Sequence, residues 1–155
     1  HDVIALTRMA AKTYVDTPTG KVSEADKERA LQAVDAGSAW LDSFTEEIDP
    51  QEITFLRAGI TYIKGWVYMT SHDHYPAIPL LQEAFALQKE IKDAENYVFP
   101  LAALSQCYSE LGDTDALHNL LIEVKETIKT TSLHSGKLRT LAREIEKELS
   151  GQDEA

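Results

Sequence analysis

Residues 65–84 read GWVYMTSHDHYPAIPLLQEA, and residues 105–124 read SQCYSELGDTDALHNLLIEV. Each matching residue of the second stretch lies 40 positions after its counterpart in the first. Both stretches begin with a small residue followed three places later by tyrosine, as Gly65 with Tyr68 and Ser105 with Tyr108. Small or apolar residues then follow at helical spacing: Ala77, Leu81 and Ala84 in the first, Leu117, Leu121 and Val124 in the second. A fixed period of this length predicts a helical repeat protein.

The composition agrees with a helical domain. Of the 155 residues, 43% are hydrophobic and 26% are charged, which is typical of one globular domain. The 7 glycines and 5 prolines lie mostly between the periodic stretches, so they interrupt few helices. The sequence therefore predicts an all-α fold.

Periodicity and end signals predict seven helices, at about 2–15, 23–44, 50–70, 75–92, 96–111, 114–129 and 136–149. Ser23 begins a capping box, Asp49-Pro50 is typical of a helix start, and Gly112 is typical of a helix end. Pro79 is expected to delay or kink its helix. The last helix has a narrow apolar stripe, as a capping helix would, and 151–155 is predicted to be a flexible tail.

Lys64-Gly65-Trp66-Val67-Tyr68, with the small residues of the following helix and the second copy at 101–124, resembles the tetratricopeptide repeat (TPR). Lys64 stands where that family usually has leucine, and the period exceeds the usual ~34 residues. The resemblance implies an α-solenoid of antiparallel helix pairs in one domain, 1–150. Its parts would be a degenerate N-terminal helix pair (1–48), two repeats (50–92 and 96–129) and a capping helix (136–149).

The resemblance also implies a concave groove lined by the first helix of each pair. The residues expected to face it are Tyr62, Ile63, Trp66, Met69, Phe99 and Gln106. Such an apolar, aromatic surface is typical of peptide-binding grooves, so the favoured function is a scaffold module that binds a peptide or protein segment. Two alternatives remain open. The N-terminal helices cover Tyr62, Ile63 and Trp66, or the same surface forms a homodimer interface.

The charge limits the partners. Against 15 basic residues the chain has 26 acidic ones, a net charge of −11, which disfavours nucleic-acid binding. An acidic run at 42–52 is interpreted as a solvated helix end, or as a docking patch for a basic partner. No apolar run approaches the ~20 residues that a membrane span needs. The compartment stays open: the cytoplasm is favoured, and a start at His1 instead of methionine leaves an exported or excised form open.

One constellation, His72-Asp73-His74, has residue types that bind metal ions. Further ligands are needed, and His118 is the nearest candidate. The favoured interpretation is a surface loop with two solvated histidines, and a metal-dependent enzyme is the least favoured function. Phosphate-binding glycine loops and nucleophile elbows are missing. We therefore predict no catalytic residues, no metal and no cofactor, and a buried structural role for the single cysteine, Cys107.

Overall fold

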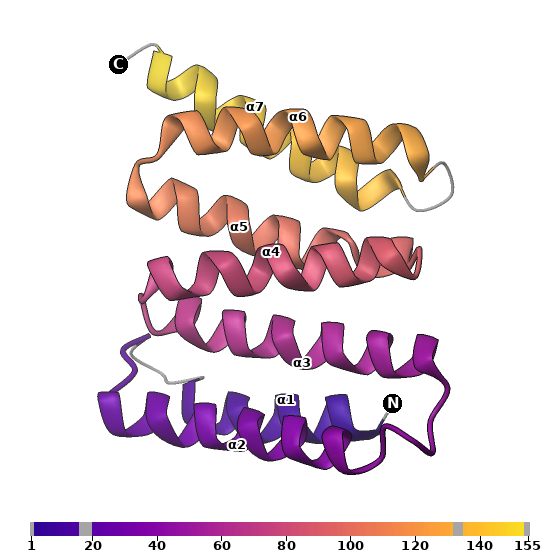
Figure 1. Ribbon diagram of the computed structural model, residues 1–155. Helices are drawn as coiled ribbons and strands as arrows, with labels where there is room; N and C mark the ends of the chain where they lie inside the picture. Colours follow the sequence, from indigo (N-terminus) through magenta and orange to yellow (C-terminus); the bar gives the residue numbers. More distant parts are fainter. Residues whose placement is uncertain (1, 16–19, 132–134, 154–155) are drawn as a thin grey trace.

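The computed structural model describes residues 2–15, 20–131 and 135–153, and these form seven α-helices and one short 3-10 helix (Figure 1). The elements are α1 (Asp2–Val15), α2 (Glu24–Ser43), α3 (Pro50–Thr70), α4 (His74–Glu90), η1 (Ala94–Asn96), α5 (Val98–Leu111), α6 (Thr114–Thr130) and α7 (Ser135–Asp153). No strand occurs within these ranges, so the all-α prediction is confirmed. None of the described helices is long and apolar enough to cross a bilayer.

The helices run back and forth, and each packs against the next along the chain (Figure 1). The closest association joins α3 to α4. Contacts also join helices two apart, since α1 packs on α3 and α5 packs on α7. Both α1 and α5 also contact α3, the helix that carries most of the predicted site residues.

Local signals explain where several helices begin. Ser23 Oγ accepts a hydrogen bond from the backbone N–H of Asp26 at 3.1 Å, and the Asp49 carboxylate accepts one from Gln51 at 2.9 Å. Each bond satisfies a backbone donor that has no partner inside its helix. The two predicted caps are therefore confirmed.

The same turn ends three successive helices, α3, α4 and α5. Its central residue has a left-handed φ, which is 59° at His72, 56° at Lys92 and 66° at Gly112. An aspartate follows each time and donates its backbone N–H to the carbonyl five positions earlier at 2.9 Å: Asp73 to Tyr68, Asp93 to Gln88 and Asp113 to Tyr108. This is the hydrogen-bond pattern of a Schellman helix end. Only the glycine at 112 was recognised in the sequence as such a signal.

The apolar core has two parts. A cluster with Val34, Leu41 and Ile63 lies among α1, α2 and α3. A second cluster, with Leu101, Cys107 and other residues, runs from the end of α3 to α7. Tyr62 and Trp66 are partly buried and pack against both clusters. The prediction of a buried Cys107 is confirmed.

Three predicted boundaries were wrong. The helix α4 begins at His74 and contains Pro79 at an exposed position, so the proline does not delay its start. It ends at Glu90, and η1 replaces the expected first turn of α5. The helix α7 continues to Asp153, because buried Leu149 holds its last turns on the core. The predicted flexible tail is thus wrong for 151–153, and 154–155 lie outside the described residues. Residues 132–134, between the predicted helices at 114–129 and 136–149, also lie outside them.

Candidate functional site

A cavity of about 620 Å³ lies between α1, α3 and the segment from the end of α4 to the start of α5. The α1 wall consists of Ile4, Arg8, Met9 and Lys12. The α3 wall consists of Phe55, Ala58, Gly59, Tyr62, Ile63 and Trp66. Gln88, Asp93, Asn96 and Phe99 line the remaining side. The volume lies in the range of small-molecule and side-chain binding sites.

Four of the six predicted site residues line this cavity, namely Tyr62, Ile63, Trp66 and Phe99. The rings of Tyr62 and Phe99 lie 6.3 Å apart between centroids, so α3 and α5 share one aromatic wall. Met69 lies outside the cavity and is buried in the core cluster that extends to α7. Gln106 also lies outside it, exposed on α5, with its side-chain amide 3.4 Å from the Glu110 carboxylate.

The helix α1 decides how much of the aromatic surface is covered. It approaches α3 so closely at Gly59 that a Cβ atom there would lie 2.6 Å from Cδ1 of Ile4. Ile63 is consequently buried, with 2% of its surface exposed. Tyr62 and Trp66 stay partly exposed, and Phe99 is 44% exposed. The N-terminal helices thus cover Ile63 and leave the aromatic residues at the surface of the cavity.

The α1 wall adds charge that the sequence analysis missed. Burial raises the pKa of the Tyr62 phenol, and the nearby Arg8 guanidinium opposes this rise. Lys12 lies one turn further along the same wall, while Asp93 lies across the cavity. The repeat pattern starts at 50, so it carries no signal for α1 residues in the groove.

Gln88 is the most unusual residue of the lining. Only 5% of its surface is exposed, and its side-chain oxygen Oε1 has no hydrogen-bond donor among the described residues. A buried acceptor without a donor costs about 1–3 kcal/mol of stability.

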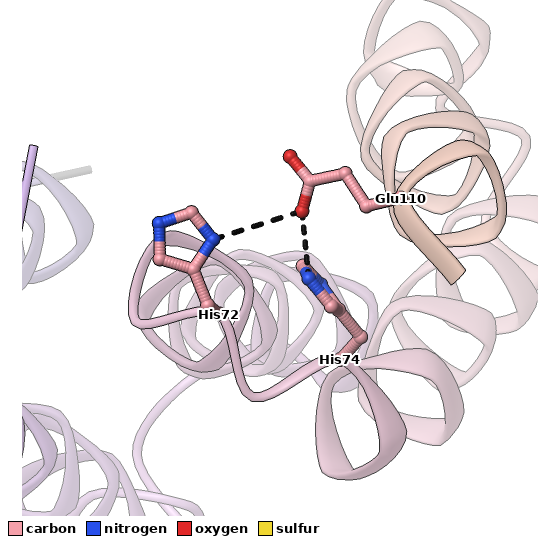
Figure 2. Close-up of side chains that lie close together, drawn as sticks. All are labelled: His72, His74 and Glu110. Carbon is pink, nitrogen blue, oxygen red and sulfur yellow. Dashed lines mark ion pairs between the residues drawn. The ribbon is translucent and has the colours of Figure 1, made fainter. Parts of the chain in front are cut away.

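The histidines of the α3–α4 turn are arranged differently from the prediction. Figure 2 shows His72 and His74 converging on Glu110 of α5. Nε2 of His74 lies 2.6 Å from the Glu110 carboxylate, and Nδ1 of His72 lies 3.8 Å from it. The His74 side chain is only 10% exposed, so the expectation of two solvated histidines was wrong for His74. The helix α5 ends beside the turn and brings Glu110, instead of His118, to the pair.

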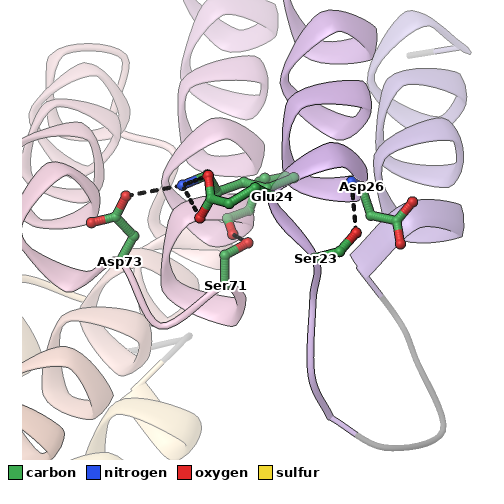
Figure 3. A network of polar contacts seen from close by, with 7 residues as sticks. Ser23, Glu24, Asp26, Ser71 and Asp73 are labelled. Atoms are coloured by element: carbon green, nitrogen blue, oxygen red, sulfur yellow. Dashed lines mark hydrogen bonds and ion pairs between the residues drawn. The ribbon is translucent and has the colours of Figure 1, made fainter.

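Asp73 points to a different set of residues (Figure 3). Its carboxylate lies 3.4 Å from Nζ of Lys27, which also lies 3.0 Å from the Glu24 carboxylate. The hydrogen bond to Glu24 raises the pKa of Lys27, burial opposes the rise, and Asp73 adds to it. Asp73 therefore ties α2 to the α3–α4 turn and is no part of the histidine cluster.

Comparison with protein-family models, with curated proteins and with solved structures found no match for this chain.

Proposed function

We propose that this chain is a TPR-like helical-repeat domain that binds a peptide or protein segment in the cavity between α1, α3 and α5. The observation that carries the proposal is the cavity of about 620 Å³ with Tyr62, Trp66 and Phe99 in its walls. The close packing of α3 on α4 supports the family assignment. The small residue Gly65 contacts Leu81, as the resemblance to the tetratricopeptide repeat implies.

The chemistry of the walls defines the ligand class. Tyr62, Trp66 and Phe99 offer apolar faces to one aromatic or branched side chain of the ligand. Because Arg8 and Asp93 give the cavity both signs of charge, the apolar anchor determines affinity more than net charge does. We therefore expect a short segment with one buried apolar anchor.

The test is a selection of binders from a random peptide display library, followed by affinity measurement with labelled peptides. Trp66→Ala should weaken binding about 30-fold or more, as loss of a central aromatic contact does at other interfaces. Trp40→Ala is the matched control, because Trp40 is 45% exposed on α2 and lies outside this cavity. Phe99→Ala removes a more exposed ring, so it separates loss of contact from loss of fold. Peptides that bind Trp66→Ala and Phe99→Ala as well as the unchanged chain would overturn the proposal.

Self-association is the second candidate, and a specific surface favours it. Leu6 is 65% exposed on α1, and Trp40 lies against Phe44 with ring centroids 5.0 Å apart on α2. Leu6 and Trp40 also line a second cavity of about 840 Å³ between α1, α2 and the start of α3. Light scattering across a concentration range separates the surfaces. A dimer that Leu6→Glu dissociates uses the α1–α2 face, and one that Trp66→Ala dissociates uses the aromatic groove.

A further inference from the structure

Three side chains with metal-binding chemistry meet where the α3–α4 turn faces the end of α5. His72 occupies the left-handed position of the turn, His74 begins α4, and Glu110 lies in the last turn of α5. One donor atom from each residue lies within 4.8 Å of the other two (Figure 2). Among the described residues this is the one such group of histidine, cysteine and acidic side chains.

The distances suit a single ion between the three groups. Donors bound about 2.0–2.2 Å from a tetrahedral ion lie roughly 3.3 Å from one another. The carboxylate oxygen is now 2.6 Å from His74 Nε2 and 3.8 Å from His72 Nδ1, so the two separations bracket that value. The His72 and Glu110 side chains are 65% and 35% exposed, which leaves them free to adjust by rotation. His74 is held in place by burial and gives the site a fixed point.

The cluster is a property of this turn and not of the repeated turn in general. The equivalent left-handed positions at the ends of α4 and α5 are Lys92 and Gly112, which carry no imidazole. Asp73, which follows His72, pairs with Lys27. The carboxylate that contacts both histidines is therefore that of Glu110. Nδ1 of His74 is buried without a hydrogen-bond partner among the described residues, so Nε2 is the nitrogen directed at the shared carboxylate.

We propose that His72, His74 and Glu110 bind one divalent transition-metal ion of the Zn²⁺ type, with solvent completing its coordination. Zinc binds a donor set of two imidazoles and one carboxylate more readily than magnesium or calcium does. The ion lies between Nε2 of His74, Nδ1 of His72 and the Glu110 carboxylate. It thereby links the α3–α4 turn to the end of α5, and so joins two successive helix pairs. This inference is independent of peptide binding, because the three residues lie outside the aromatic cavity.

The test is calorimetric titration of the full chain, without a polyhistidine tag, with ZnCl₂ in a non-chelating buffer. We expect one ion per chain, and a tetrahedral visible spectrum when Co²⁺ replaces Zn²⁺. His72→Asn and Glu110→Gln should each weaken binding by at least the about 10–100-fold that loss of a supporting partner costs. Asparagine is chosen at 72 because it tolerates the left-handed conformation. His118→Asn is the matched control, since His118 is exposed and outside the cluster.

Thermal unfolding provides a second readout that does not depend on heat of binding. Zinc should raise the Tm of the unchanged chain and of His118→Asn, and leave that of His72→Asn unchanged. The proposal fails if no ion binds, or if His72→Asn binds zinc as tightly as the unchanged chain. It also fails if Glu110→Gln lowers the Tm equally with and without zinc, because the cluster would then be a hydrogen-bonded clamp only.

Discussion

Gly65 of α3 lies against Leu81 of α4 so closely that a Cβ atom at position 65 would stand 2.9 Å from both Cγ and Cδ2 of Leu81. Carbon atoms in good contact lie about 3.5–4.0 Å apart, so a side chain at 65 forces the helices to separate or Leu81 to move. Leu81 is fully buried, so any movement disturbs the core around it. The absent side chain at 65 therefore sets the distance between the two helices.

Gly65→Ala should lower the free energy of unfolding by up to about 2 kcal/mol. Overpacking costs about 1–3 kcal/mol, while alanine gains about 1 kcal/mol over glycine as a helix former. Urea denaturation measures the difference. Gly136→Ala is the control, because a Cβ atom there meets nothing within 4 Å and only the helical gain remains. Equal stability changes in the two variants would contradict the packing argument.

Replacing Gln88 should raise the stability of the fold. Gln88→Met removes the buried oxygen that has no donor, so the free energy of unfolding should rise by about 1 kcal/mol. Urea denaturation measures the difference. Gln32→Met, at an exposed position of α2, is expected to leave the stability unchanged. A loss of stability in Gln88→Met would contradict the assignment of a buried acceptor without a donor.

Cys107 should be unreactive in the folded protein. Burial, with a smaller contribution from the Glu110 carboxylate, raises the pKa of its thiol from 9.0 to about 11. At pH 8 only about one thiol in a thousand is then ionised, and the thiolate is the reactive form. Ellman's reagent should modify the native chain very slowly and the urea-unfolded chain at once. Rapid modification of the native chain would show that the thiol is accessible.

The same raised pKa predicts a pH dependence of stability. Between pH 9 and about 11 the unfolded chain loses the thiol proton while the folded chain keeps it, so stability falls as the pH rises. Below pH 9 the contribution is fully present. The urea midpoint of the unchanged chain should therefore fall more between pH 8.5 and 10 than that of Cys107→Ala, which cannot ionise at this position. Parallel pH profiles would contradict the assignment.

The left-handed turn positions predict opposite changes in stability for two substitutions. Lys92 has a φ of 56°, which is unfavourable for a residue with a Cβ atom, while Gly112 has a φ of 66° at no such cost. Lys92→Gly should raise the free energy of unfolding by about 0.5–1 kcal/mol, and Gly112→Ala should lower it by about 1 kcal/mol. Thermal unfolding of both variants is the measurement. A loss of stability in Lys92→Gly would show that the lysine side chain contributes more than its strain costs.

The sequence was informative where the signal is local. Asp49-Pro50 predicted the start of α3, and the apolar face of its helix predicted that Cys107 is buried. It was less informative where a stable turn lacks its usual residue. His72 and Lys92 occupy left-handed positions without glycine, so the turn common to α3, α4 and α5 went unrecognised.

The candidate sites depended on contacts between distant segments. Trp66 and Phe99 were assigned to one surface from the resemblance to the tetratricopeptide repeat, and both line the cavity. Arg8 could not be assigned to the cavity from the sequence, because its position depends on how α1 packs onto α3 at Gly59. Glu110 could not be joined to His74 for the same reason, since only the packing of α5 beside the α3–α4 turn brings the carboxylate to the imidazole.

Tyr62 and Trp66 pack against both core clusters, and this has a consequence for how the molecule unfolds. The two clusters meet at α3, so cooperativity between the two halves passes through this helix and these two rings. Trp66 fluorescence should therefore report the separation of the halves, whereas Trp40 on α2 should report only the N-terminal half. A peptide of the proposed kind, bound at Trp66, would stabilise this junction and make the chain unfold as a single unit.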